Sequence, residues 1–316
     1  MIISKGKKES FLIILFIMVL IITIGCSKNM DSIVSDDSPK TKTTSSDNLN
    51  ATIDSTENND KAQENTDNKY YKLSSQYGTD KNTSFRDLFE SEDALSRLKK
   101  LNKELKDKFD YWEIEFQPLF YVGYYDKDEK FIYSIDSKNK IAKNDEGEEM
   151  YVTGIKTLQM GNKASSKYNK LIEMGDNFSA EDFIINSDGE MVNCILGNNY
   201  KEYYNIGDEI PLVLHQKIIN FKVIGFYKQG TSVSQYKGNE VKLDNFMIMP
   251  FYDINYNPTD EMDDLYQKIY YTQKNEGYIK SENIDDLRKN SERDDFKNLV
   301  QNLSNKYNLK YLLISS

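Results

Sequence analysis

The chain has 316 residues, of which 38% are hydrophobic and 12% aromatic, so it has the apolar side chains that a folded core requires and is not disordered throughout. Its formal net charge of −10 at pH 7 disfavours binding to nucleic-acid phosphates or to anionic lipid headgroups. One histidine and two cysteines nearly exclude a His/Cys metal site, a His-based catalytic triad and a disulfide framework.

The first thirty residues indicate where the protein is located. A basic segment with three lysines precedes an apolar stretch, residues 11–24, that Thr23 alone interrupts. This stretch is shorter than the ~20 residues that span a bilayer, and it fits the ~7–15 apolar residues of a signal peptide. It ends in Gly25-Cys26, which resembles the lipobox of bacterial lipoproteins, where the cysteine is lipidated and becomes the mature N-terminus. Thr23 departs from the Leu, Val or Ile usual at its position.

We therefore expect residues 1–25 to be a lipoprotein signal peptide and Cys26 to carry the lipid. Two or more acyl chains on this cysteine would hold the protein stably at the extracytoplasmic face of the cell membrane. The alternative is an uncleaved signal anchor with Cys26 at the membrane surface. Both alternatives place the rest of the chain outside the cytoplasm, because the basic segment stays inside.

The next segment has the composition of a tether. Residues 27–69 contain no aromatic side chain and are rich in Ser, Thr, Asp, Asn and Lys, so they cannot bury enough apolar surface to offset the entropy of ordering. With Cys26 they form a predicted disordered linker, residues 26–69, whose root-mean-square reach is ~35–40 Å. A low-complexity segment without a role would have the same composition. Residues 70–316 are predicted to be an extracytoplasmic domain.

The first half of this domain is predicted to contain one helix and several strands. Leucines recur at helical spacing between residues 95 and 105, after a variant capping box at Ser84 and Asp87, and predict a helix over 87–107. Aromatic and β-branched residues then predict strands at 111–117, 119–125, 130–136 and 151–160, with residues 126–128 as the turn of a hairpin.

In the second half, residues 165–185 have a mixed helical and loop pattern, and turn residues follow at 186–189. Further strands are predicted at 191–196, 209–214, 217–227, 246–250, 269–272, 277–280 and 311–314. A helix over 284–306 is predicted from an apolar stripe of Phe296, Leu299, Val300, Leu303 and Tyr307. The pattern predicts an α+β fold of mixed sheets, with a helix near each end and a β-rich middle lobe.

The strand at 217–227 is apolar on both sides. Phe221, Val223 and Tyr227 are predicted to share one face, and Ile224 and Phe226 the other, so both faces should be buried.

The stretch from Cys194 to Pro250 carries the most specific local signals. A strand ends at Leu196, Gly197 permits a sharp exit, and Asn198 can cap a one-turn helix that carries Tyr200 and Tyr204.

Two later glycines in this stretch also have predicted roles. Gly207 and Asp208 form a turn, in which Gly207 is suited to a positive φ. Gly225, inside a strand, indicates a bulge or a close approach of another backbone.

This order of elements resembles the extracytoplasmic core domain of MacB-like ABC permeases of the FtsX superfamily. In that family a "vilG" strand end, a short helix, a "vGD" turn, a strand, an "f.VvG" strand and a strand ending in Pro follow one another. The matching residues here are Ile195, Leu196 and Gly197, then Ile206, Gly207 and Asp208, then Phe221, Val223, Ile224 and Gly225, then Met249 and Pro250. The resemblance is clear over 190–250 and looser over 85–125.

Such a resemblance implies a fold more than an activity. The permeases of this family continue into several C-terminal transmembrane helices, whereas no apolar stretch after residue 26 approaches that length. The chain also has no G-x-x-x-x-G-K-[ST] motif for nucleotide binding. We therefore expect a non-enzymatic accessory or partner-binding component of an export or antimicrobial-peptide-resistance system, with ABC transporter components as its partners, or a degenerate permease.

Other chemistry has weaker signals. Asp126, Asp128 and Asp136 lack the glycine and distal glutamate of a Ca²⁺ loop, which favours a plain hairpin turn. The acidic residues of 260–264 are typical of a solvated loop or a helix start. His215 lies between two predicted strands, in a loop position, without a second histidine or a cysteine beside it.

Cys194 is predicted to pack as a small apolar strand residue, because no activating partner for a reactive thiol is evident. We expect no cofactor, no metal and no nucleic-acid partner. Two alternative functions remain open. One is a lipoprotein that captures a small molecule or peptide in a pocket, and the other is an extracytoplasmic hydrolase with acid, base or nucleophile in a cleft. No motif such as G-x-S-x-G supports the second.

Overall fold

The computed structural model describes residues 69–77, 84–143, 147–234, 240–281 and 290–315. All of them belong to one compact unit, residues 67–316. The predicted signal peptide, Cys26 and nearly all of the predicted linker lie outside the described residues. None of the helices in the described part of the chain has the length and apolar character needed to cross a membrane.

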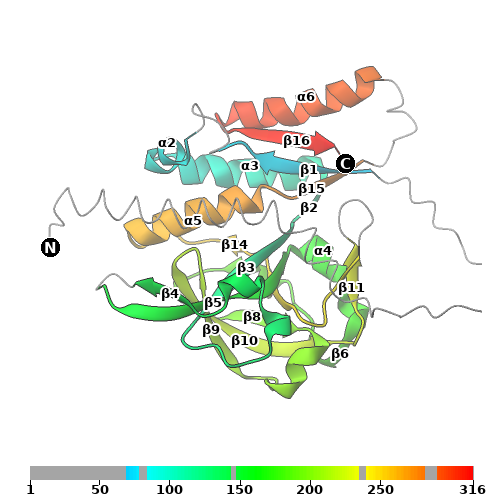
Figure 1. Cartoon of the computed structure of the whole chain (residues 1–316). Coiled ribbons are helices and arrows are strands. Elements are labelled where there is room, and N and C mark those ends of the chain that lie inside the picture. Colours follow the sequence, from blue (N-terminus) through cyan, green and yellow to red (C-terminus); the bar gives the residue numbers. More distant parts are fainter. Residues whose placement is uncertain (1–68, 78–83, 144–146, 235–239, 282–289, 316) are drawn as a thin grey trace, which may run out of the picture. The chain divides into compact units, whose positions relative to one another are not determined.

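An antiparallel sheet of four strands is built from both ends of this unit (Figure 1). In spatial order its strands are β16 (Tyr311–Ser315), β1 (Lys69–Ser75), β15 (Tyr278–Ser281) and β2 (Asp110–Trp112). A short helix, α2 (Phe85–Glu90), and the longer α3 (Ala94–Lys108) connect β1 to β2, and α6 (Asn290–Lys306) connects β15 to β16. This βαββαβ order is that of ferredoxin-like domains.

The predicted helix over 87–107 is two helices. The first, α2 (Phe85–Glu90), begins at Ser84, whose hydroxyl accepts a hydrogen bond from the backbone N–H of Arg86, and ends where Ser91 becomes extended. The second is α3, whose leucines are buried as their spacing predicts. In α6 the predicted apolar stripe is confirmed for Val300 and Leu303, which are buried. The prediction is wrong for Leu299, which is 56% exposed. The predicted helix residues 284–289 lie outside the described residues.

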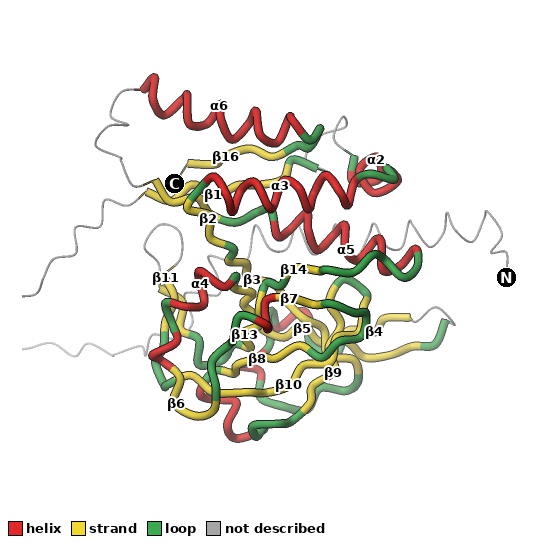
Figure 2. The backbone as a smooth tube through the Cα atoms, turned by 180° about the vertical axis from the view of Figure 1, so that it is seen from behind, coloured by secondary structure: helices red, strands yellow, loops and turns green. Residues whose placement is uncertain are grey.

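Between β2 and β15 the chain forms a closed barrel of six strands, seen from behind in Figure 2. Around the barrel these are β3 (Ile114–Val122), β5 (Glu149–Met160), β13 (Met247–Pro250), β8 (Val192–Leu196), β10 (Lys217–Tyr227) and β9 (Glu209–Leu214). The pairs β5–β13 and β8–β10 are parallel, and β3 closes on β9 through Phe120 and Val213. Closure leaves these strands without a free edge. The fold is therefore α+β with mixed sheets.

Shorter elements surround the barrel. β4 (Lys140–Lys143) pairs with β5, and β6 (Ile172–Gly175) pairs with β10. Two small ladders join β7 (Ile184–Ile185) to β14 (Asp253–Ile254) and β11 (Ser232–Ser234) to β12 (Glu240–Lys242). The helices are α4 (Asn162–Ser166), α5 (Glu261–Lys274) and the 3₁₀ turns η1 (Glu129–Phe131), η2 (Ile135–Ser137), η3 (Asn169–Leu171), η4 (Glu181–Phe183) and η5 (Asn198–Glu202).

Three strand predictions are wrong. Instead of a strand over 130–136, the chain forms η1, a single bridge from Ile132 to Ile155, and η2, because Asp128 accepts a hydrogen bond from the backbone N–H of Lys130 and starts a helical turn that buries Phe131. Residues 269–272 belong to α5, since a short apolar run fits a buried helix as well as a strand. The predicted break at Pro118 is absent, and β3 runs through it.

The predicted bulge at Gly225 is confirmed, and it corrects the assignment of faces in β10. The register with β8 shifts between Val223 and Gly225. As a result Phe226 packs in the same core cluster as Val223, whereas Tyr227 packs in the other cluster with Ile224. Both faces of this part of the strand are buried, as predicted.

Gly197 provides a test of the close packing at the end of β8. A Cβ atom at this position would overlap the backbone carbonyl oxygens of Leu243 and Asp244. We expect Gly197→Ala to lower the free energy of unfolding by about 2–3 kcal/mol in urea titrations. The matched control is Gly189→Ala, where the φ of 75° is strained for alanine but no atom lies within 4 Å; its expected loss is about 1 kcal/mol. Equal losses would contradict this packing.

Candidate functional site

The structure brings two of the sequence-predicted residues, Leu196 and Tyr200, to one recess among the barrel strands. We call it the tyrosine recess, and its lining residues are Tyr121, Tyr125, Ile155, Leu196, Tyr200, Tyr204, Ile210, Leu212 and Met247. It has room for about one water molecule. Four of its nine lining residues are tyrosines, so it is aromatic with a few polar groups.

A lysine ammonium lies against these tyrosines. The Nζ of Lys127 is 5.6, 5.9 and 5.5 Å from the ring centroids of Tyr121, Tyr125 and Tyr204. Tyr200 lies beside Tyr204, with 6.1 Å between ring centroids, and packs on Phe131 at 4.0 Å.

Two hydroxyls of the tyrosine recess are buried without a partner. Tyr125 and Tyr200 are 3% and 4% exposed, and neither hydroxyl has a hydrogen-bond partner among the described residues. Burial raises the pKa of both phenols, and it raises the pKa of Tyr204 to about 12. All three phenols are therefore neutral at physiological pH and can donate or accept a hydrogen bond.

The other predicted motif residues lie away from the recess lining. Gly207 has a φ of 94° and its N–H donates to the carbonyl oxygen of Val223, so the predicted turn is confirmed. The Asp208 carboxylate accepts from the backbone N–H of Asn205 at 2.8 Å and holds this turn. Gly225 lies where the backbone of Asp176 approaches it, and Pro250 ends β13 opposite Met160.

The predicted capping role of Asn198 is wrong. Gly197 occupies the cap position of η5 without a side-chain hydrogen bond. The Asn198 amide instead donates to the carboxylate of Glu173 at 2.8 Å and to the carbonyl oxygen of Tyr227 at 3.3 Å. It therefore fastens η5 to β6 and to the end of β10.

Neither Cys194 nor His215 is in its charged form at physiological pH. Cys194 is fully buried in β8, and burial raises the pKa of its thiol far above the usual range. His215 lies in the turn between β9 and β10, and burial lowers its pKa to about 4, so it is neutral at physiological pH. Within the described residues no group of three or more His, Cys, Asp or Glu side chains is placed to hold a metal ion, Asp126, Asp128 and Asp136 included.

A second cluster of functional groups, which the sequence did not predict, surrounds α5. This helix begins at Asp260, whose carboxylate accepts from the backbone N–H of Asp263. Asp263 is itself buried, and its carboxylate lies 2.5 Å from the Nζ of Lys217 at the start of β10. The predicted helix start in this acidic segment is thus confirmed, but Asp263 is a buried ion-pair partner rather than a solvated residue.

The other end of α5 carries a fully buried lysine. The Nζ of Lys274 donates to the carbonyl oxygens of Phe251 at 2.6 Å and Tyr252 at 2.7 Å. It also lies 3.2 Å from the carboxylate of Asp253 and 3.6 Å from that of Glu113. Burial lowers the pKa of this ammonium, and the two carboxylates oppose that shift. We call these five residues the Lys274 cluster.

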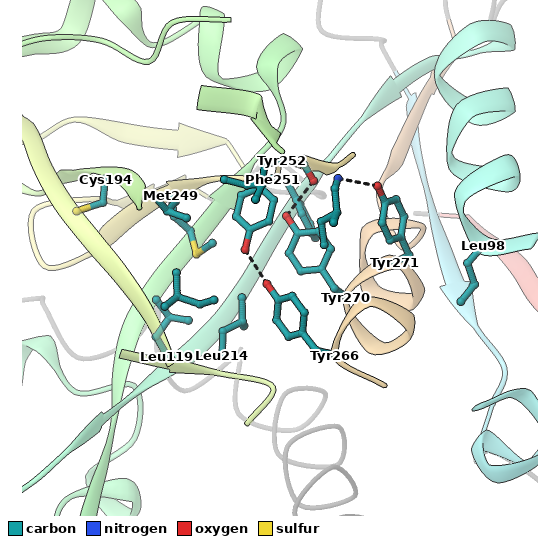
Figure 3. Packing of buried hydrophobic residues seen from close by; sticks show 14 of the residues in the cluster. Leu98, Leu119, Cys194, Leu214, Met249, Phe251, Tyr252, Tyr266, Tyr270 and Tyr271 are labelled. Carbon is teal, nitrogen blue, oxygen red and sulfur yellow. Dashed lines mark hydrogen bonds between the residues drawn. The ribbon is translucent and has the colours of Figure 1, made fainter. Parts of the chain in front are cut away.

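The tyrosines of α5 point toward the segment after β13 (Figure 3). The hydroxyls of Tyr252 and Tyr266 are 2.6 Å apart, and Tyr270 donates to the carbonyl oxygen of Tyr252 at 3.1 Å. Tyr271 accepts from the backbone N–H of Ile254 at 3.0 Å. The tyrosine-rich composition of 266–271 was the available signal for this packing, but its apolar run resembles a strand.

The helix also binds the four-stranded part of the unit. Lys268 of α5 donates to the carbonyl oxygen of Phe89, and Asn275 donates to that of Leu98. From α3, Lys99 donates to the carbonyl oxygen of Ile254 and to the side chain of Gln267. Because α5 is hydrogen-bonded in both directions, it fixes the barrel against α2 and α3.

No family model matches the chain, and comparison with curated proteins and with solved structures gave no match.

The Lys274 cluster yields a prediction about stability. Lys274→Met leaves the Glu113 carboxylate and two carbonyl oxygens buried without their cation, so we expect the free energy of unfolding to fall by about 3–5 kcal/mol. A double variant with Glu113→Gln should recover part of that loss, because no unpaired carboxylate remains. Lys103→Met, at an exposed lysine of α3, is the matched control and should unfold like the wild type. A loss no greater than that of the control would contradict the role of the cluster.

Proposed function

We propose that the chain is a lipid-anchored, extracytoplasmic, non-enzymatic domain of the MacB-like core type, serving as a partner-binding component of an export or antimicrobial-peptide-resistance system. The observation that carries this proposal is the order of elements over 190–250. There β8, η5, the turn at Gly207, β9, β10 and, after the small β11–β12 ladder, β13 come in the order that the family resemblance implies.

The surroundings of the reactive side chains support a binding role over catalysis. Lys274 and Asp263 are engaged in buried ion pairs that hold α5. The Cys194 thiol stays protonated, and His215 stays neutral, since burial disfavours their charged forms. A cysteine nucleophile requires the thiolate, and an imidazole whose pKa is lowered to about 4 is a weak proton acceptor.

The two recesses described around the barrel give little support to the capture of a small molecule. The tyrosine recess and a second recess beside Lys217 and Tyr256 each have room for about one water molecule. Ligand pockets in proteins are far larger, ~300–1,000 Å³. Contact with a partner surface therefore fits these recesses better than enclosure of a ligand.

The hydrogen bonds of α5 support a role in transmitting movement. The Lys274 cluster connects the end of the barrel to α5, and the hydrogen bonds of Lys268 and Asn275 connect α5 to α2 and α3. A displacement of the barrel would therefore displace these helices as well. This connection suits a domain that transmits a conformational change from one bound partner to another.

The lipid anchor is tested by mass spectrometry of the chain purified from membranes. We expect the mature N-terminus to be Cys26 with acyl chains attached, and Cys26→Ser to lose both the cleavage and the lipid. The matched control is Cys194→Ala, which removes the other cysteine and should leave Cys26 lipidated. An intact Met1 without lipid in the wild type would refute the anchor.

The partner role is tested by affinity isolation of the tagged chain from detergent-solubilised membranes of the native host. We expect the ATPase and permease subunits of an ABC exporter to be enriched. The control is a tagged segment of residues 1–69, which keeps the same anchor and linker without the domain. Equal recovery with both chains would remove the support for an exporter partner.

A further inference from the structure

Three tyrosine rings surround one ammonium at the tyrosine recess. Tyr121 lies in β3, Tyr125 in the loop after it, and Tyr204 in the segment after η5, so three separate parts of the fold converge on Lys127. A cation over an aromatic face is attracted by the electron density of the ring. The arrangement is a cation-binding cage, and in this structure the chain's own lysine occupies it.

The cage also has hydrogen-bond acceptors that nothing uses. The hydroxyls of Tyr125 and Tyr200 are buried at the recess without a partner among the described residues. A buried polar group without a partner is costly, and such groups are rare in folded proteins. Each phenol oxygen can accept a hydrogen bond, and a primary ammonium has three N–H donors to give.

The charges around the cage favour a cation. The carboxylates of Asp126 and Asp128 act electrostatically on Tyr125, and those of Asp126 and Asp208 on Tyr204. The formal charge of the whole chain is −10. A basic ligand would therefore be attracted both to the protein and to this part of it.

Lys127 is placed to leave the cage. It lies half-buried in the loop between β3 and η1, after Gly123 with its φ of 125°. Among the described residues its ammonium has no ion pair or hydrogen bond, so the rings alone hold it. By contrast, Lys130 in the adjoining turn η1 forms ion pairs with Asp128 and Glu202. A ligand ammonium that replaces that of Lys127 gains the same ring contacts, and one that enters the recess more deeply than Lys127 does can also donate to the two hydroxyls.

We propose that the tyrosine cage binds the ammonium of a lysine side chain on a partner polypeptide, and that Lys127 occupies the cage until this ligand displaces it. The inference rests on the proposed partner-binding role and names the chemistry of one group on the partner. It does not depend on the lipid anchor or on the identity of an exporter.

The test uses fluorescein-labelled hexalysine as the probe and fluorescence anisotropy of the full chain in detergent at fixed, low ionic strength. Lys127→Ala empties the cage, and we expect it to tighten the Kd by about five- to thirtyfold relative to wild type, the range of a partly to fully desolvated cation–π contact. Lys130→Ala is the matched control, because it removes the same charge from the adjoining turn η1 without emptying the cage. It should change the Kd by less than about twofold.

Two further arms separate the cage from its alternatives. Hexa-acetyl-lysine, which has the same stems without the charge, should show no gain with Lys127→Ala. Adding Tyr125→Phe and Tyr200→Phe to Lys127→Ala keeps the rings but removes the hydroxyls. We expect this triple variant to bind hexalysine with a Kd about fivefold weaker than that of Lys127→Ala.

Several outcomes would overturn the proposal. These are an equal Kd for Lys127→Ala and Lys130→Ala, an equal gain with the acetylated probe, and no loss on removal of the two hydroxyls. If Lys127→Ala does not fold by circular dichroism, Lys127→Gln replaces it, since glutamine retains part of the side-chain stem. A failed exporter isolation alongside a positive cage result would reject the exporter role and leave the cage standing.

Discussion

The interaction on which the rest of the structure depends is the burial of one ammonium, that of Lys274, between two carbonyl oxygens and two carboxylates. An unpaired charge at this depth would cost several kcal/mol, so the groups that face it must stay in place. Two of them, Phe251 and Tyr252, follow the last barrel strand, and a third, Glu113, lies between β2 and β3. The Lys274 side chain thereby holds together the segment that leads into the first barrel strand and the segment that follows the last one.

Buried charges and buried hydroxyls differ in how they are paired at two places in the structure. Around α5 the buried charges are paired, since Asp263 and Lys274 have partners within hydrogen-bond distance, although the side-chain oxygens of Gln273 and Asn275 have none among the described residues. At the tyrosine recess, Tyr125 and Tyr200 keep buried hydroxyls without partners. Stability alone explains the first place, because satisfied polar groups cost little. The second is understandable when a partner supplies the missing donors, which is the role proposed for the tyrosine cage.

Local signals in the sequence predicted local structure well. Strands β9 and β10 have the predicted bounds, and the special conformations at Gly207 and Gly225 are those expected of glycine in a turn and in a bulge. Features that depend on distant segments could not be predicted. The closure of β3 on β9, the burial of Lys274 and the meeting of Tyr121 with Tyr204 each join residues far apart in the chain, and no periodicity records which segments meet. Beyond its start, helix α5 was missed because it is buried on most sides with polar as well as apolar residues, so no apolar stripe of helical period marks it.

The insertion of the barrel between β2 and β15 has a consequence for how the chain folds. Strand β1 pairs with nothing close to it in sequence, since Leu73 is opposite Leu313 and Tyr71 is opposite Ile279. Loop closure on this scale is entropically expensive, and topologies dominated by such distant pairs fold slowly. The barrel strands are all complete by Pro250, whereas the four-stranded sheet requires β15 and β16 from the last part of the unit. Until those strands are present β1 is an unpaired edge, and this is the stage of folding at which a chaperone or protease would act on the chain.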